Sequence, residues 1–180
     1  ALLVLDEVQT GMVRTGTLFA YEQFGVTPDL MTLAKALGNG LPIGALLATE
    51  EAAGAFTPGA HAATFGGNHL VTSVAGRVLA TLSEPAFLEK VRQTGAYFQD
   101  RLKSLVEEFP VVREARGLGL LLGLVLEIPG KAVVEACREK GFLINCTQDT
   151  ILRFAPPLVV GRGEIDELVA GLREIFKEAG

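Results

Sequence analysis

The first 35 residues contain two short apolar runs, each followed by a polar residue, and this pattern restricts the fold more than any other feature. Residues 1–6 (ALLVLD) end in an acid, and residues 29–34 (DLMTLA) end directly before Lys35. Between them, residues 17–25 (TLFAYEQFG) place aromatic and apolar side chains close to helical spacing. A strand, a helix and a strand in this order predict a right-handed βαβ unit with parallel strands.

Parallel strands would place Asp6 and Lys35 at the same edge of one sheet. That edge, at the carboxyl ends of the strands, is where open α/β sheets bind ligands. We expect the first strand to be buried, because parallel strands are usually covered on both faces. We also expect Lys35 to be partly desolvated, because its neighbours on both sides are apolar residues or glycine.

The rest of the chain predicts further strands and several helices. Apolar runs and turn residues predict a strand at 43–49, a short helix at 50–55, a loop at 57–69, a helix from 70 that Pro85 breaks, and an amphipathic helix at 86–109 that Pro110 ends. The last part resembles a small α+β unit, with strands around a glycine turn at 113–127, a helix at 131–141, strands at 142–146 and 151–158, and a final helix at 164–179.

Composition narrows the class of protein. Apolar residues make up 49% of the chain, which is enough for a sizeable core, and the formal net charge is −5. A negative balance disfavours nucleic acid and anionic membranes as partners, and no apolar run is long enough to span a bilayer. The two cysteines have no metal-ligand spacing. We therefore expect a cytoplasmic protein without a metal site. Because the sequence starts at Ala1 inside a predicted strand, we also expect a C-terminal fragment of a longer protein.

Two motifs have alternative interpretations. An apolar strand ending in Asp6 and Glu7 is also typical of a Walker B motif, but the G-x-x-x-x-G-K-[ST] loop of nucleotide hydrolases is absent from this sequence. A buried structural acid is a further alternative. GLGLLLG at 117–123 lacks the third glycine spacing of a dinucleotide site, and we interpret it as a tight turn. Lys35 by itself is either a solvated loop lysine or an amine for Schiff-base chemistry.

Four segments in order resemble one enzyme family. They are DEVQTGMVRTG (6–16), PDLMTLAKALGNGLPIGA (28–45), HAATFGGNHL (61–70) and ILRFAPPL (151–158). Their order and spacing resemble the class III (subgroup II) pyridoxal-phosphate aminotransferases, above all the acetylornithine and acetyl-lysine enzymes. The resemblance implies a fold-type-I α/β fold. Residues 1–80 would then be the end of the large, mostly parallel cofactor-binding domain, and residues 81–180 a small α+β C-terminal domain.

The resemblance also implies roles for individual residues. Lys35 would bond the aldehyde of pyridoxal phosphate (PLP) and then carry a proton during the reaction. Asp6 would pair with the pyridine nitrogen, Val8 would pack on the ring, and Gln9 would donate a hydrogen bond near the phenolic oxygen. Two further residues complete the set: Thr64 would reach the phosphate of a partner subunit's cofactor, and Arg153 would bind a substrate carboxylate.

The implied reaction moves the terminal amino group of N-acetylornithine, or a similar N-acylated diamino acid, to 2-oxoglutarate in arginine or lysine biosynthesis. The implied assembly is a homodimer with a shared active site. Another class III activity, on ornithine or 4-aminobutyrate, and a truncated non-catalytic fragment remain alternatives. The sequence departs from the family at Val13, where relatives usually have glycine, and at His69, where they usually have proline.

Overall fold

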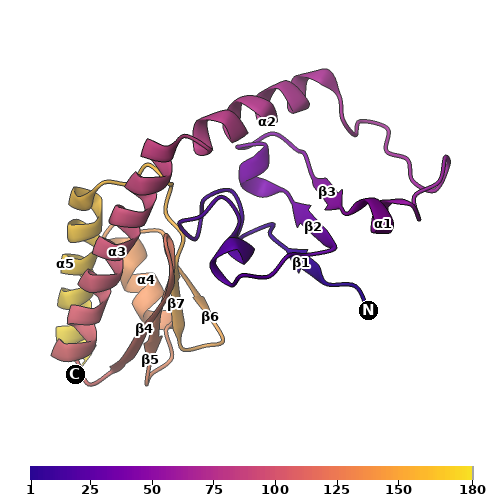
Figure 1. The fold of residues 1–180 in the computed structure, drawn as a ribbon. Helices are drawn as coiled ribbons and strands as arrows, with labels where there is room; N and C mark the ends of the chain where they lie inside the picture. Colours follow the sequence, from indigo (N-terminus) through magenta and orange to yellow (C-terminus); the bar gives the residue numbers. More distant parts are fainter. Residues whose placement is uncertain (180) are drawn as a thin grey trace. The chain divides into compact units, whose positions relative to one another are not determined.

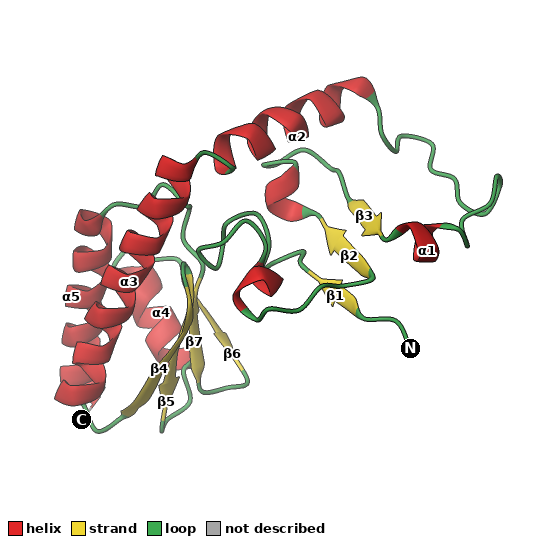
Figure 2. Ribbon diagram, in the orientation of Figure 1, coloured by secondary structure: helices red, strands yellow, loops and turns green. Residues whose placement is uncertain are grey.

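The structure is a computed structural model that describes residues 1–179. It divides into two compact units, Ala1–Glu89 and Lys90–Gly180. Each unit contains its own β-sheet, of three strands in the order β1-β2-β3 and of four strands in the order β4-β5-β7-β6 (Figures 1 and 2). The two sheets separate the predicted site residues into two groups, which are described in turn.

The sheet of the first unit mixes parallel and antiparallel pairing. Its strands are β1 (Val4–Asp6), β2 (Leu30–Leu33) and β3 (Ala45–Ala48). The predicted parallel pairing of the first two strands is confirmed, with Asp6 aligned to Thr32. β3 pairs with β2 in the antiparallel direction. Within the described residues this sheet therefore has one parallel and one antiparallel pair, rather than the mostly parallel arrangement that we expected.

Two predictions for this unit are wrong. The first strand is not buried, since the side chains of Leu2 and Val4 are 61% and 57% exposed. The helix predicted at 17–25 is only a 3-10 turn, η1 (Ala20–Gln23). A carboxylate oxygen of Glu22 accepts a hydrogen bond from the backbone N–H of Phe19 at 3.1 Å. The segment with helical spacing is too short to form an α-helix. Forming the first helical turn costs free energy, and only several further hydrogen-bonded residues offset that cost.

The remaining elements of the first unit follow the sequence closely. They are η2 (Lys35–Leu37), α1 (Glu50–Ala53) and α2 (His69–Leu82). α2 begins after Asn68, whose side-chain oxygen accepts a hydrogen bond from the N–H of Val71 at 3.2 Å. The predicted break is confirmed, because α3 (Pro85–Glu108) starts at the proline, where a missing N–H costs no intrahelical bond.

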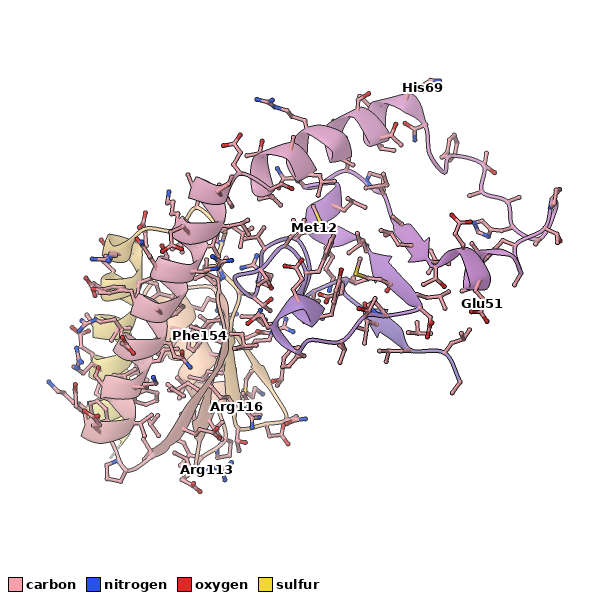
Figure 3. The ribbon with its side chains drawn as sticks, in the orientation of Figure 1. Met12, Glu51, His69, Arg113, Arg116 and Phe154 are labelled. Carbon is pink, nitrogen blue, oxygen red and sulfur yellow. The ribbon has the colours of Figure 1, made fainter. Side chains whose placement is uncertain are left out.

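The second unit is an antiparallel sheet covered on one side by helices (Figure 1). Its elements after α3 are β4 (Val112–Leu118), β5 (Leu121–Leu126), α4 (Lys131–Glu139), β6 (Asn145–Thr147), β7 (Ile151–Phe154) and α5 (Arg162–Ala179). The glycine turn between β4 and β5 is confirmed. The strand predicted at 142–146 begins later, at Asn145. Phe154, labelled in Figure 3, packs edge to face on Phe98 with ring centroids 5.5 Å apart.

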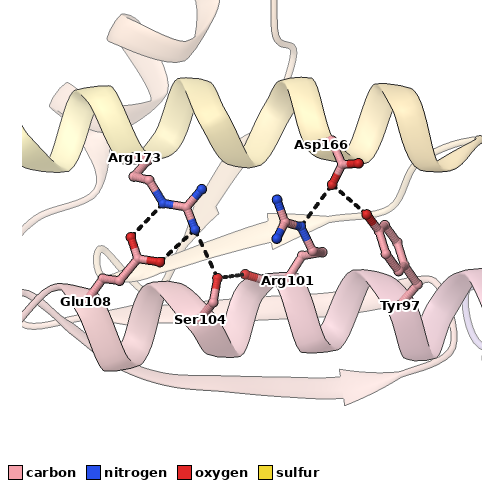
Figure 4. Close-up of polar contacts among 6 residues, drawn as sticks. All are labelled: Tyr97, Arg101, Ser104, Glu108, Asp166 and Arg173. Carbon is pink, nitrogen blue, oxygen red and sulfur yellow. Dashed lines mark hydrogen bonds and ion pairs between the residues drawn. The ribbon is translucent and has the colours of Figure 1, made fainter.

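Polar side chains join α3 to α5 beside this core (Figure 4). The Tyr97 hydroxyl donates to Oδ1 of Asp166 at 2.7 Å, and Nε of Arg101 donates to the same oxygen at 2.9 Å. Two turns farther along, Arg173 holds Glu108 through two hydrogen bonds of 2.6 and 2.7 Å. This bidentate geometry fixes the two helices in register as well as in distance.

One glycine of α3 lets the sheet approach the helix. A Cβ atom built on Gly95 would lie 2.6 Å from the carbonyl oxygen of Gly119, which is closer than real Cβ contacts. Gly119 lies in the turn between β4 and β5 and has a φ of 55°. The pair of glycines therefore explains why the turn can pack directly against the helix backbone.

Candidate functional site

Asp6 stands at the carboxyl end of β1 with one side-chain oxygen held by two donors. Its Oδ1 accepts a hydrogen bond from the N–H of Val8 at 2.9 Å and another from the hydroxyl of Thr32 at 3.3 Å. Within residues 1–179, no hydrogen bond reaches Oδ2. The carboxylate is exposed. One oxygen is therefore fixed by the protein, and the other is available to a cationic N–H.

Glu7, the next residue, is used differently. Its side chain is only 3% exposed. Oε2 accepts from the Thr10 hydroxyl at 2.5 Å, and Oε1 accepts from the backbone N–H of Tyr21 at 2.9 Å. This acid is structural, because its carboxylate ties the loop after β1 to η1. A Walker B role needs a carboxylate that faces magnesium and water. The Glu7 carboxylate is buried, and each of its oxygens already accepts a hydrogen bond.

Lys35 follows β2 and begins η2 in a left-handed backbone conformation, with a φ of 45°. Such a φ is uncommon for a residue other than glycine and costs about 1–3 kcal/mol. The N–H of Gly38 donates to the carbonyl of Lys35 at 3.1 Å, which closes the turn. Non-glycine residues held in this region cluster at functional sites, so the backbone conformation of Lys35 supports a functional role independently of its side chain.

The side chain of Lys35 is exposed, which corrects the expectation of a partly desolvated amine. Its apolar neighbours Leu33 and Leu37 are buried, at 6% and 7% exposure. Among the described residues, the amine forms no hydrogen bond or ion pair. The spacing of Asp6 and Lys35 on two aligned parallel strands brings both to one edge of the sheet, as predicted.

The loop between Asp6 and η1 contains a second left-handed segment. Met12 and Val13 have φ values of 56° and 69°, and Val13 is fully buried. The N–H of Val13 donates to the carbonyl of Leu18 at 3.1 Å, and the N–H of Gly16 donates to the carbonyl of Val13 at 3.0 Å. A β-branched residue is strained in this conformation, whereas glycine is not. This gives a physical reason why glycine suits position 13.

Val8 and Gln9 follow Asp6 in the same loop, with Val8 half-buried and Gln9 exposed.

An open hollow of about 460 Å³ lies on this unit, lined by Leu46, Ala48, Ala53, Phe56 and His61. Leu46 is aligned with Thr32 across β2 and β3, and Thr32 is aligned with Asp6 across β1 and β2. Residues aligned in this way share a face of a sheet. The hollow therefore opens on the face that carries Asp6.

Thr64 lies in the exposed loop that precedes α2, so its hydroxyl is accessible. His61 is exposed in the same loop, and His69 is the first residue of α2 (Figure 3). Proline is favoured at the first helical position, where the missing N–H costs nothing. The residue at 69 therefore departs from the family at a position where proline is structurally compatible.

Arg153 belongs to the second unit. It lies on β7, aligned with Gly123 of β5 and Asn145 of β6. Its Nε donates to Oδ1 of Asn145 at 3.2 Å, and the residue is half-exposed. Gly123 leaves no side chain beside the arginine on the inner strand. The Asn145 amide is thus one of the groups that orient the guanidinium.

Neither a metal site nor a membrane-spanning helix is found between residues 1 and 179. No three His, Cys, Asp or Glu side chains of that range are grouped so as to hold a metal ion. No helix in the same range is both long and apolar enough to cross a bilayer.

Burial raises the pKa of the Cys137 thiol to about 11, so this cysteine stays protonated near neutral pH.

The sequence model of the family Aminotransferase class-III matches residues 1–176. The chain belongs to the class III aminotransferases. It is 50% identical over 177 residues to an acetylornithine aminotransferase of Methanocaldococcus jannaschii, a match that covers 98% of this chain and 44% of the relative. The resemblance predicted from the four sequence motifs is thereby confirmed at the level of the family.

Solved structures of class III aminotransferases have the same fold. An N-acetylornithine aminotransferase from Stenotrophomonas maltophilia is 39% identical and superposes with a TM-score of 0.87. The match covers all of the present chain and 49% of the Stenotrophomonas chain. An ornithine aminotransferase from Toxoplasma gondii, with PLP at partial occupancy in its active site, is 35% identical with a TM-score of 0.90, covering 98% and 43%. The chain therefore spans about half the length of these class III relatives.

Proposed function

We propose that this chain forms part of a PLP-dependent aminotransferase. The proposed reaction moves the terminal amino group of N-acetylornithine, or a similar N-acylated diamino acid, to 2-oxoglutarate in arginine or lysine biosynthesis. The observation that carries the proposal is the placement of Asp6 and Lys35 at the ends of two aligned parallel strands. Membership of the family and the acetylornithine names of its relatives support the choice of substrate.

The residues of the first unit fit the cofactor by their chemistry. Asp6 presents an acceptor oxygen to a protonated ring nitrogen. Lys35 is exposed, and its amine forms no hydrogen bond with a described residue. In the proposal, Val8 covers one face of the ring, Gln9 donates near the phenolic oxygen, and Thr64 donates to a phosphate. A homodimer is part of the proposal, because Thr64 is assigned to the cofactor of the partner subunit.

When bound, PLP supplies an electron sink for the removal of a proton from the substrate carbon. The chain supplies the groups around that step. Asp6 would accept a hydrogen bond from the ring nitrogen, and the Lys35 amine would take the proton and return it at a neighbouring carbon. Arg153 orients the substrate through a carboxylate, since a guanidinium binds a carboxylate in a two-pronged geometry that a lysine cannot reproduce.

The finer fold assignment is also part of the proposal. Residues 1–80 are assigned to the large, mostly parallel domain of a fold-type-I enzyme, and residues 81–180 to its small C-terminal domain. The antiparallel sheet and three helices of the second unit support the α+β character of the latter. A cytoplasmic location remains a prediction from composition.

Reductive labelling tests the proposal. The protein is mixed with PLP, treated with borohydride, digested and mapped by mass spectrometry. We expect a stable pyridoxyl group on Lys35 and a visible absorbance band that borohydride removes. Lys35→Ala should abolish both, whereas Lys103→Ala, which removes a lysine that is half-exposed on α3, should change neither. Equal labelling of many lysines, or none of Lys35, would overturn the cofactor assignment.

Substrate choice needs a separate measurement. Transamination rates with N-acetylornithine, ornithine and 4-aminobutyrate as donors separate the proposed activity from the alternatives. The structural similarity to an ornithine aminotransferase makes ornithine the second candidate. A higher kcat/KM for ornithine than for N-acetylornithine would favour that candidate.

A further inference from the structure

Thr32 makes two contacts with the segment that carries Asp6, and neither was expected from the sequence. Its hydroxyl donates to Oδ1 of Asp6 at 3.3 Å. Its carbonyl accepts a hydrogen bond from the N–H of Glu7 at 3.0 Å. The strand that leads to Lys35 therefore holds both the side chain of Asp6 and the backbone directly after it.

We propose that Thr32 is a positioning residue that fixes the orientation of the Asp6 carboxylate toward the ring nitrogen of the cofactor. The inference rests on the proposed function. The N–H of Val8 comes from the loop after Asp6, whereas the hydroxyl of Thr32 comes from the neighbouring strand. Two donors from different directions fix the rotation of a carboxylate, which a single donor leaves free.

The position of the Thr32 hydroxyl is itself well determined. Thr32 lies between Met31 and Leu33, which are 5% and 6% exposed and anchor β2 in the unit. Its β-branched side chain has few accessible rotamers, so the hydroxyl does not need to be ordered when a ligand arrives. Oδ1 of Asp6 is thus engaged before the cofactor binds, and Oδ2 has no hydrogen-bond partner among the described residues.

The same residue links the two chemical groups of the site. Thr32 lies on β2, is aligned with Asp6 of β1, and precedes Lys35, the first residue of η2, by three residues. The register of β1 and β2 therefore sets both the contact between Thr32 and Asp6 and the position of Lys35 relative to Asp6. Preorganisation of this kind lowers the reorganisation that a charged group must undergo during reaction.

The test compares two substitutions. Thr32→Val keeps the shape and removes the donor, while Thr32→Ser keeps the donor. In the PLP-loaded protein, the 15N chemical shift of ring-labelled cofactor reports on the hydrogen bond between the ring nitrogen and Asp6. We expect Thr32→Val to change this shift and lower kcat about 3- to 10-fold with an unchanged KM for 2-oxoglutarate, as loss of one hydrogen bond implies. Thr32→Ser should restore both.

Thr147→Val, in a strand of the second unit, is the matched control and should change neither quantity. Urea unfolding midpoints equal to that of the wild-type protein identify variants that fold normally. An unchanged 15N shift and rate in a folded Thr32→Val protein that still labels at Lys35 would overturn the inference alone. Absence of PLP bonded to Lys35 in the unsubstituted protein would overturn the proposed function instead.

Discussion

In the second unit, three helices cover one face of the sheet and leave residues such as Leu124 and Leu152 with no exposed surface. In the first unit, Val4 and Leu46 on the sheet remain 57% and 48% exposed, and the predicted site residues are exposed or half-buried. Stability in the second unit therefore comes from apolar burial. The first unit depends more on hydrogen bonds from side chains such as Glu7 and on tightly closed turns.

The backbone shows the same difference. Six residues other than glycine have a positive φ among those described, and four lie in the first unit: Met12, Val13, Lys35 and Asn39. The other two, Gln148 and Asp149, form the turn between β6 and β7. Asn and Asp tolerate this conformation well, whereas valine and lysine do not. The first unit thus stores strain around its candidate site, and the described non-glycine residues with a positive φ in the second unit lie in the turn between β6 and β7.

The largest expected effect separates activity from stability in the first unit. Lys35→Ala should lower kcat by at least about 10²- to 10⁴-fold, because the amine is the proposed proton carrier. Lys35→Gly should be equally inactive but more stable to urea than Lys35→Ala by about 1 kcal/mol, since glycine adopts a φ of 45° without strain. Steady-state rates and unfolding curves test both. Equal stability of the two variants would argue against strain at this residue.

The next effect tests the contrast in burial. Leu124→Ala removes a fully buried side chain from β5 and should lower the free energy of unfolding by about 2–5 kcal/mol. Leu46→Ala, at a half-exposed strand position of the first unit, should change it by less than about 0.5 kcal/mol. Urea unfolding followed by circular dichroism measures both. Similar losses in the two variants would contradict the difference that we infer between the units.

A smaller effect tests the polar support of the first unit. Glu7→Gln keeps the shape of the side chain but presents an amide group to one of its two donors, Thr10 or the N–H of Tyr21. We expect a loss of about 1–3 kcal/mol, as for a buried group left without its partner. Glu22→Gln is the control, because it changes an exposed acid of the same loop region. If Glu7→Gln unfolds at the wild-type urea concentration, the buried carboxylate is not a support.

Local rules in the sequence were enough for much of the fold. Pro85 and Pro110 marked helix boundaries, and the glycines at 117 and 119 marked the hairpin turn, because each effect depends on neighbouring residues alone. The common edge of Asp6 and Lys35 followed from the parallel pairing of two strands. The exposure of β1 and the partners of Glu7 did not follow, since burial and contacts across 14 residues depend on tertiary packing.

The residues of the candidate site were predicted from motifs and stay predictions, while parts of their geometry could not be predicted from the sequence. Motifs identified Asp6, Lys35 and Arg153, but no sequence rule predicts that lysine adopts a left-handed φ. Thr32 was missed for a related reason. Its hydroxyl matters only because β1 and β2 align it with Asp6, and register is set by the whole sheet rather than by the strand itself.

The smallest effect concerns pH and the helix pair of the second unit. The hydrogen bond from Arg173 holds the pKa of Glu108 below its usual value of 4.5. A folded-state pKa below the unfolded one adds stability above the unfolded value, and this contribution disappears as the pH falls through the folded value. Glu108→Gln should therefore make stability fall less steeply with acid below about pH 4.5, and Glu107→Gln, an exposed neighbour, should not. Unfolding midpoints measured from pH 7 to pH 3 test this, and parallel curves for wild type and Glu108→Gln would show that the ion pair is too solvated to contribute.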